Sequence, residues 1–585
     1  MSPAMHNIHN GYISRLSIGR VILFALLAGG VAGRAVADAS HPKVDPAVES
    51  ALTQMSNTST LRVIVRAAAG KYSTLRTRVV GTRRKIDAEH LFINALTAEL
   101  GKADISMLES DANAARISLD HTVLSTAVAA QPAPAVPIDA GLLATLGLVN
   151  STNTGNGVGV AIVDSGIQPS TYLSPFAFKD FTNTCKSACD DYGHATHISG
   201  LIRAVAANNP TPMIGVSPGV RLMSMKVLDS TGRGYASTVL TALEYLLNNR
   251  ATYGLDIVNL SLGHIITESA WSDPLVQAVE ALSRKNIVMV VAAGNLGENP
   301  STGLPAYGGI TSPGNAPSAI TVGAFDTKQT ATRSDDQVPT YSSRGPTWYD
   351  GFVKPDIVAP GHNLVSLAAI DSRLYTQYPD LRVTDGAGVA RFMQLSGTSM
   401  ATAVTTGVAA LLIEQHRGVS PLPLTPNDIK AVLQFTAIPI DSADVWAQGA
   451  GAINFLGARD VVKVLTGSAD PTMRSTTIVD PPSTTIATGM TYSWGRTIIW
   501  GHTCVYGDTI YANEPAWASQ TTWGSAVVWV HSWAGGGDLV WDSAPTWSAN
   551  TIWDPIVAPS TSGQSWPEIG AQAKTIIWGH GSGPY

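Results

Sequence analysis

Three residues far apart in the sequence carry the groups that nucleophilic acyl transfer needs: Asp164, His194 and Ser399. Ser399 lies within residues 396–402 (Ser-Gly-Thr-Ser-Met-Ala-Thr), where small residues lead from a loop into a long apolar helix. A serine at a helix start has its hydroxyl and N–H at the positive end of the helix dipole, which suits a nucleophile. The pattern is also typical of a serine that caps a helix, so the hypothesis depends on its partners.

Asp164 ends an apolar, β-branched run at residues 158–163 and is followed by Ser165 and Gly166. Such a run predicts a buried parallel strand with a carboxylate at its carboxyl end, the edge at which open α/β sheets keep their chemistry. The alternative is an aspartate that starts a turn.

His194 lies in residues 193–200 (Gly-His-Ala-Thr-His-Ile-Ser-Gly), where a helical, alanine-rich stretch that runs to Ala207 begins. A single histidine is more often structural than catalytic. His197 follows three residues later, which on a helix places both rings on one face and allows metal ligation as an alternative. This stretch lacks the glutamate of the zinc-protease pattern, which disfavours that alternative.

Together these segments resemble the subtilisin-like serine proteases (subtilases), in the chain order Asp, His, Ser. The matching motifs lie at residues 164–166 (Asp-Ser-Gly), 193–197 (Gly-His-Ala-Thr-His) and 397–402 (Gly-Thr-Ser-Met-Ala-Thr). A fourth, at residues 291–297 (Val-Ala-Ala-Gly-Asn-Leu-Gly), resembles the family's oxyanion-hole segment. Each motif is weak or middling alone, but four in the family's order are a strong signal, and the resemblance covers roughly residues 140–465.

The resemblance assigns a role to each of these groups. His194 is implied to take the proton of Ser399 as the serine attacks a carbonyl carbon, while Asp164 orients the imidazole and stabilises its charged form. The side-chain amide of Asn295 and the backbone N–H of Ser399 are implied to donate to the developing oxyanion.

Two departures from the family pattern lie beside the implied site. Ala195 replaces the glycine that usually follows the catalytic histidine, and Ala403 and Val404 replace a usual proline and a common histidine. Neither departure removes a reacting group, although both alter the packing beside the site.

A substrate cleft is also implied by the resemblance. An extended peptide can add itself as a strand to exposed backbone, and glycine lets it approach closely, although the same glycines also suit turns. Small residues before Asn295 imply a roomy apolar pocket for the residue that precedes the scissile bond. The expected cleft residues are Gly232, Gly234, Ser261, Leu262, Gly263, Ala292 and Gly294.

A scaffold that positions these residues is predicted over residues 138–466, where strand-like and helix-like segments alternate. Strands are expected at 221–228, 257–260 and 287–291, and a helix at 237–249. The predicted fold class is α/β: a mainly parallel, subtilisin-like sheet with helices on both faces, preceded by a small α/β propeptide and followed by a Trp-rich β-repeat tail.

Residues 1–39 are typical of an export signal, because Arg15 and Arg20 precede an apolar run at 21–28 and residues 35–37 (Ala-Val-Ala) offer a cleavage site. The run is shorter than the ~20 residues that a membrane span needs, which disfavours the alternative of a retained anchor. We therefore expect a secreted or cell-surface protein that meets the membrane only during export.

Residues 40–137 are predicted to form a small separate unit and a linker. Residues 61–66 indicate a strand, 92–100 and 114–119 indicate further core segments, and the proline-rich residues 131–137 indicate an extended linker with processing nearby. The order resembles the subtilase propeptide, which assists folding and inhibits the enzyme until it is removed. An ordinary accessory domain is the alternative.

Residues 467–585 differ in composition, because 11 of the 14 tryptophans follow residue 490. Residues 497–502 (Thr-Ile-Ile-Trp-Gly-His) recur at 575–580, and Trp529, Trp541 and Trp553 are evenly spaced, which predicts short repeated strands. We favour tryptophans that fill a repeat core over exposed ones that bind carbohydrate or a surface.

Composition excludes some functions and leaves others open. A net charge of −6 with only 14% charged residues gives no basic face for nucleic acid. Export allows a disulfide between Cys185 and Cys189, which would leave Cys504 as the third cysteine without a disulfide partner in the chain. The implied chemistry requires no cofactor. Structural calcium is possible near Asn208–Asn209, but no ligand set is identifiable and metal-binding residues stay unknown.

The sequence therefore predicts a secreted serine endopeptidase that hydrolyses protein or peptide substrates through an acyl-enzyme on Ser399, with its own propeptide as intramolecular inhibitor. One alternative is a catalytically silent surface or adhesion protein with a protease-like scaffold. The complete set of Asp164, His194, Asn295 and Ser399 argues against it. The acid-acting serine-carboxyl peptidases, which use glutamate in place of the histidine, are disfavoured by His194.

Overall fold

The computed structural model describes residues 43–126, 128–129, 140–149, 151–205, 213–299 and 301–465, and in the carboxy-terminal part 474–477, 482–487, 489–501, 503–506, 509–512, 529–530 and 541–542. The expected export signal, the proline-rich linker at 131–137, Asn208–Asn209 and the second Thr-Ile-Ile-Trp-Gly-His copy lie outside these residues. Among the helices described, none is both long enough and apolar enough to cross a membrane.

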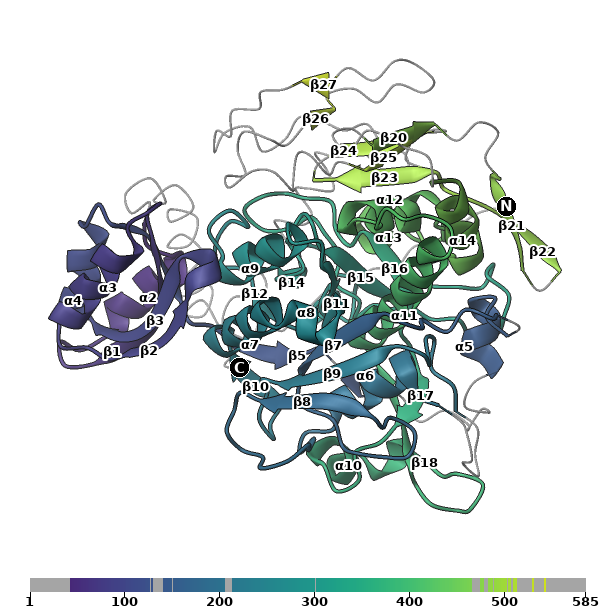
Figure 1. Ribbon diagram of the computed structural model, residues 1–585, viewed down its shortest axis with the longest axis horizontal. Coiled ribbons are helices and arrows are strands. Elements are labelled where there is room, and N and C mark those ends of the chain that lie inside the picture. Colours follow the sequence, from purple (N-terminus) through teal and green to yellow (C-terminus); the bar gives the residue numbers. More distant parts are fainter. Residues whose placement is uncertain are drawn as a thin grey trace, which may run out of the picture.

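The amino-terminal unit (residues 43–121) forms a compact body at one end of the molecule, drawn in purple in Figure 1. Its sheet has the order β2-β3-β1-β4, and β1 is antiparallel to both of its neighbours. Apolar side chains of this sheet and of its helices form a core of their own, including Val63, Val65 and Leu100. The elements are α2 (Pro46–Gln54), β1 (Thr60–Ala67), α3 (Tyr72–Gly81), β2 (Ile86–His90), η2 (Leu91–Ile93), β3 (Ala95–Gly101), α4 (Lys102–Glu109) and β4 (Ala114–Leu119).

A seven-stranded sheet forms the centre of the rest of the molecule, with the order β16-β15-β13-β11-β7-β9-β8 and parallel pairing throughout. Six of its strands are near-continuous runs of buried residues, as a parallel sheet covered by helices requires. The strands are β7 (Gly159–Asp164), β8 (Phe176–Asp180), β9 (Arg221–Lys226), β11 (Leu255–Leu260), β13 (Val288–Ala292), β15 (Ile320–Phe325) and β16 (Ile357–Pro360). The predicted parallel sheet is confirmed.

The helices of this part pack in two groups: α7 packs on α9, whereas α11 packs on α6, α14 and the strands β11, β13, β15 and β16. The prediction that α6 runs to Ala207 is wrong, because the helix ends at Arg203 and the chain turns away at Ala204. The helices are α5 (Ala140–Thr145), α6 (His194–Arg203), α7 (Ala236–Asn248), α8 (Arg250–Tyr253), α9 (Pro274–Ser283), α10 (Arg373–Gln377), α11 (Thr398–Arg417), α12 (Pro426–Phe435), α13 (Val445–Gln448) and α14 (Phe455–Val464).

Two small sheets bring distant segments together beside the central sheet. One has the order β10-β5-β12-β14, and in the other β17 and β18 flank β19, which also pairs with β6. The strands β5 and β6 therefore connect the amino-terminal unit to the main body. The elements are β5 (Thr122–Ser125), β6 (Val128–Ala129), β10 (Arg233–Tyr235), β12 (Leu262–Ile265), β14 (Thr311–Ser312), β17 (Leu364–Leu367), η3 (Pro379–Leu381), β18 (Arg382–Val383) and β19 (Phe392–Ser396).

Short antiparallel pairs make up the described carboxy-terminal part, drawn in yellow-green in Figure 1. Two tryptophans there, Trp494 and Trp500, are buried, which agrees with the core interpretation for these two residues. The repeat itself stays a prediction. The pairs are β20 (Arg474–Thr477) with β25 (Thr509–Ala512), β21 (Thr484–Ala487) with β22 (Met490–Ser493), β23 (Thr497–Trp500) with β24 (Thr503–Tyr506), and β26 (Trp529–Val530) with β27 (Trp541–Asp542).

Candidate active site

Asp164 and His194 come together at the carboxyl edge of the central sheet. Asp164 is the last residue of β7, and His194 is the first residue of α6, which follows the left-handed Gly193 (φ 104°). Both carboxylate oxygens of Asp164 lie 2.9 Å from His194 Nδ1, and the backbone N–H of Ser165 donates to the same carboxylate. Because both side chains are fully buried, this carboxylate holds the ring with its Nε2 facing away from Asp164.

Ser399 occupies the second residue of α11, close to the positive end of that helix. Gly397 is the N-cap residue, with a φ of 146° that favours glycine, so the interpretation of Ser399 as a helix cap is wrong. Ser399 Oγ lies 2.6 Å from the hydroxyl of Thr126 and donates over 3.3 Å to the carbonyl of Ser261. Within the described part of the chain, His194 Nε2 makes no hydrogen bond.

Asn295 is fixed by the loop that follows β13. Its side-chain oxygen accepts a hydrogen bond of 3.0 Å from the Thr398 N–H, and its side-chain amide donates to the carbonyl oxygen of Thr126. Because the oxygen is already engaged, the amide N–H groups are the ones that face the cleft. The side chain is therefore oriented as a donor to a peptide carbonyl.

The strand β5 fills the cleft that the sequence predicted. It is antiparallel to β10 on one side, with Val123 opposite Gly234, and to β12 on the other, with Ser125 opposite Leu262 and Leu124 opposite Gly263. Two more hydrogen bonds extend the pairing, from Ser125 N–H to the Gly232 carbonyl and from Thr126 N–H to the Ser261 carbonyl. All the cleft residues expected on these two strands thus lie beside one extended segment of the same chain.

Ala292 and Gly294 lie at the end of β13, and the side chain of Thr311 lies against this stretch. A Cβ atom added to Gly294 would come within 2.9 Å of Thr311 Cγ2, and one added to Gly263 within 2.8 Å of Thr311 Oγ1. Thr311 therefore occupies the space next to the glycines that were expected to line the pocket. Sequence patterns could not identify Thr311, because it belongs to no motif and reaches the cleft through the pairing of β14 with β12.

The metal alternative for the two histidines has no support in the structure. His197 Nε2 faces the backbone carbonyls of Leu364 and Met393, each at 3.1 Å, and burial lowers the pKa of His197 to about 3. The ring is thus a neutral structural group that joins α6 to the β17–β19 sheet. Throughout the described residues, no cluster of three or more potential metal ligands is present.

A disulfide joins Cys185 and Cys189, the pair for which the sequence allowed one. The bridge closes a turn between β8 and α6, on the segment that leads to His194. The Asp180 carboxylate accepts hydrogen bonds from the backbone N–H groups of Thr182, Thr184 and Cys185 in this turn, and these hydrogen bonds contribute to a lowered pKa of Asp180.

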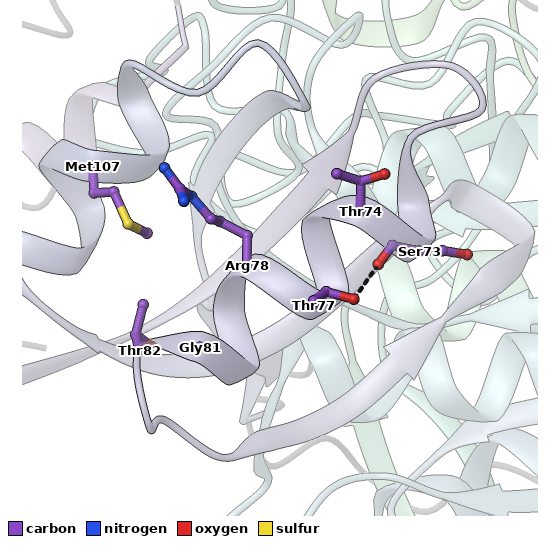
Figure 2. Close-up of a pocket in the computed structure, with 7 residues that line it drawn as sticks. All are labelled: Ser73, Thr74, Thr77, Arg78, Gly81, Thr82 and Met107. Atoms are coloured by element: carbon purple, nitrogen blue, oxygen red, sulfur yellow. Dashed lines mark hydrogen bonds between the residues drawn. The ribbon is translucent and has the colours of Figure 1, made fainter.

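A separate cavity of about 710 Å³ lies on the amino-terminal unit, as Figure 2 shows. It lies between α3 and α4, far along the chain from the triad residues, and its only drawn hydrogen bond runs from the Thr77 hydroxyl to the Ser73 carbonyl. The cavity contains no residue expected to act in catalysis. Its lining residues are Ser73, Thr74, Thr77, Arg78, Gly81, Thr82 and Met107.

The buried Asp–His pair, the serine at a helix start and the parallel sheet define a hydrolase of the serine class. The model of the subtilase family matches residues 155–469. Serine protease AprX from Bacillus subtilis (strain 168) is 32% identical over 418 residues, which cover 69% of this chain and 88% of that relative. Subtilisin E from the same organism is 29% identical over 370 residues, 60% of this chain and 83% of the relative.

Among solved structures, fervidolysin from Fervidobacterium pennivorans superimposes with a TM-score of 0.54 at 17% identity, over 74% of this chain and 64% of that structure. This likeness shows a shared fold. The chain therefore belongs to the subtilase family: it has the subtilisin-like α/β fold and is a serine endopeptidase.

Proposed function

We propose that this protein is a secreted endopeptidase that its own amino-terminal unit holds inactive, and that it cleaves itself between Thr126 and Ala127. One observation carries the proposal: Thr126 lies in the cleft as a substrate residue would, with its carbonyl oxygen on the Asn295 amide and its hydroxyl 2.6 Å from Ser399 Oγ. Because β5 is paired on both sides, a substrate peptide cannot add its own strand until this segment leaves.

The chemistry follows from the four expected residues. Ser399 Oγ attacks the Thr126 carbonyl carbon while His194 Nε2 takes the hydroxyl proton, and Asp164 stabilises the imidazolium that forms. The Asn295 amide and the Ser399 N–H, an unpaired donor of the first helical turn, hold the negative oxygen. His194 then gives the proton to the Ala127 nitrogen as the C–N bond breaks. Water hydrolyses the Thr126 ester and restores Ser399.

Contacts outside the cleft favour an inhibitor that stays docked after the cut. Asp120 accepts hydrogen bonds from the backbone N–H and the hydroxyl of Ser237, near the start of α7. Arg116 pairs with Glu268 over 2.8 Å in a buried position. The amino-terminal unit is therefore proposed to act as a propeptide. The proposed cut lies before the proline-rich residues 131–137, which would then lie near the start of the mature enzyme.

The proposal of export depends on residues 1–39, whose basic start and short apolar run are typical of a signal. The expected result is cleavage after residues 35–37 and mature enzyme outside the cell that made it. Mass spectrometry of the extracellular and cell-bound protein tests this, and full-length protein that stays in the cell would contradict it.

Self-cleavage is tested by purifying the protein beside Ser399→Ala and the control Ser73→Ala, which removes an exposed hydroxyl from the amino-terminal unit. We expect the parent and Ser73→Ala to yield a new terminus at Ala127 and to react with a fluorophosphonate probe, whereas Ser399→Ala does neither. Cleavage of Ser399→Ala by itself, or a parent cut at a different bond, would contradict the proposal.

A further inference from the structure

Tyr192 lies at the place where the residue before Thr126 enters the cleft. Its hydroxyl accepts a hydrogen bond of 3.1 Å from Ser125 Oγ, and its ring lies beside that of His194, with centroids 6.4 Å apart. The ring also covers Gly232, because a Cβ atom added there would come within 2.5 Å of the ring. The side chain of Ser125 is thus enclosed by a tyrosine on the His194 side of the cleft.

Two backbone hydrogen bonds and an ion pair fix the loop that carries Tyr192. The backbone N–H groups of Arg373 and Leu374, at the start of α10, donate to the carbonyls of Asp191 and Tyr192 at 2.9 and 3.0 Å. The buried Lys226 ammonium binds the Asp191 carboxylate at 2.6 Å. These contacts fix the backbone that carries the ring, and the hydrogen bond from Ser125 is the contact that the ring itself would lose if it moved aside.

We propose that Tyr192 sets the specificity of the enzyme for the residue before the scissile residue, and that it selects a small residue with a hydroxyl group, as serine is. The inference rests on the proposed function, because it assumes that residues 122–126 bind in the cleft as a substrate peptide does. Serine fits for two separate reasons. Its hydroxyl gives the Tyr192 hydroxyl a partner in a half-buried site, and its small side chain leaves room for the ring.

The two reasons predict different variants. Tyr192→Phe keeps the ring and removes the acceptor, so it should erase the preference for serine over alanine and still reject a bulky residue. Tyr192→Ala opens the site, so it should accept the bulky residue. A neutral hydrogen bond in such a site corresponds to roughly a two- to tenfold preference, and exclusion of a bulky side chain to about tenfold or more.

The experiment measures kcat/KM of the mature enzyme on peptides that carry Val, Leu, a variable residue and Thr before the scissile bond, the order of residues 123–126. The variable residue is serine, alanine or leucine. The enzymes are the parent, Tyr192→Phe, Tyr192→Ala and the control Tyr375→Phe. In the parent the Tyr375 hydroxyl, on α10, donates to the Ala390 carbonyl and not to the cleft segment. The concentration of active enzyme is counted in each case by fluorophosphonate labelling, so a loss of folded protein does not enter the comparison.

We expect the parent and Tyr375→Phe to prefer serine over alanine and alanine over leucine, with the shifts stated above in the two Tyr192 variants. A parent that labels fully but cleaves the three peptides equally would overturn the role of Tyr192 and leave the proposed function standing. The same holds if Tyr192→Phe keeps the preference for serine. A folded parent that neither labels nor cleaves would overturn the proposed function as well.

Discussion

The two ends of the described chain are attached to the catalytic domain in different ways. The amino-terminal unit has a core of its own, and it meets the catalytic domain through strand pairing, through buried polar contacts such as Arg116 with Glu268, and through Ile64, Ile93 and Ala95, which pack with the catalytic domain's core. Among the described residues the carboxy-terminal strands form no separate core: Ile498, Ile499 and Trp500 pack within the core of the catalytic domain. The amino-terminal unit can therefore leave with its own core intact, whereas the carboxy-terminal strands have no such core to keep.

Polar contacts reinforce the carboxy-terminal attachment. The Lys430 ammonium lies 5.1 Å from the centre of the Trp500 ring, and the side chain of Gln434 binds both backbone groups of Ile499. Both residues belong to α12, and this helix also contacts β13 of the central sheet. The comparison therefore predicts that the carboxy-terminal strands are part of the mature fold, while the amino-terminal unit is dispensable once folding is complete.

The largest effect is expected for Trp500→Ala in the mature enzyme. Removing a buried aromatic side chain from a shared core should lower the free energy of unfolding by about 3–5 kcal/mol. Urea unfolding of fluorophosphonate-inhibited enzyme measures it without self-digestion. The matched control is Trp271→Ala, whose side chain is 40% exposed and whose loss should cost less than about 1 kcal/mol. Equal effects of the two substitutions would contradict a core that Trp500 shares with the catalytic domain.

Arg116→Ala should instead leave the mature enzyme unchanged and weaken the docking of the cleaved amino-terminal unit. Removing one partner of a buried ion pair costs up to about 3–5 kcal/mol, or roughly two to four orders of magnitude in Kd. Gel filtration of the self-cleaved complex over a dilution series measures the Kd. Arg84→Ala, which breaks a pair within the unit, is the control. Docking that is equally tight in both would mean that the Arg116–Glu268 pair does not hold the unit.

Acidification is expected to act on this docking through two groups in opposite directions. His264 stacks on His121 with ring centroids 4.3 Å apart, and burial lowers the pKa of His264 to about 4 from its ordinary 6.5. Burial raises the pKa of Glu268 to about 7 from its ordinary 4.5. Release is expected to expose both groups and return their pKa values to the ordinary range. The lowered pKa of His264 in the complex then makes docking weaken as the pH falls from 7 to 5. The raised pKa of Glu268 in the complex makes docking tighten over the same range.

Single substitutions separate the two contributions. His264→Phe removes the weakening, so its complex should dock about tenfold more tightly at pH 5 than at pH 7. Glu268→Gln removes the tightening, so its complex should dock about tenfold more weakly at pH 5 than at pH 7. The parent should lie between the two variants, because the two contributions oppose each other. The same slope in both variants would contradict this account of the interface.

Much of the scaffold could be predicted from the sequence, because local patterns determine it. The run that ends at Asp164 became β7, and the glycine before His194 became the turn into α6. These short, apolar, parallel strands are specified by their own composition. The end of α6 was misplaced, because alanines favour a helix and nothing local marks Arg203 as the last helical residue.

The contents of the cleft could not be predicted, because they depend on contacts between segments far apart in the chain. Thr126 meets Ser399 across 273 residues, and Ser125 meets Tyr192 across 67. Processing was expected near the proline-rich residues 131–137, where composition changes, whereas the carbonyl that faces Asn295 belongs to Thr126. Neither Thr126 nor Tyr192 belongs to a motif: the pairing of β5 with β10 and β12 places Thr126, and the contact with Ser125 identifies Tyr192.

The smallest effect is expected at Thr126, where the polar contact of the amino-terminal unit reaches the nucleophile itself. Ser399 Oγ is engaged by the Thr126 hydroxyl at 2.6 Å and by the Ser261 carbonyl at 3.3 Å, so it must leave these partners before it can donate to His194 Nε2. Thr126→Val keeps the shape and removes the hydroxyl, and should shorten the precursor half-life roughly two- to tenfold.

Conversion of precursor to mature enzyme, followed by mass spectrometry beside the control Thr122→Val at the exposed start of β5, measures this half-life. Slower conversion of Thr126→Val would mean that the hydroxyl helps to place the scissile carbonyl. An unchanged half-life would mean that the contact does not restrain the nucleophile. Faster conversion in Thr126→Val alone would show that the hydrogen bond between Thr126 and Ser399 delays cleavage after Thr126. The contacts that hold the precursor inactive would then include one to the nucleophile itself.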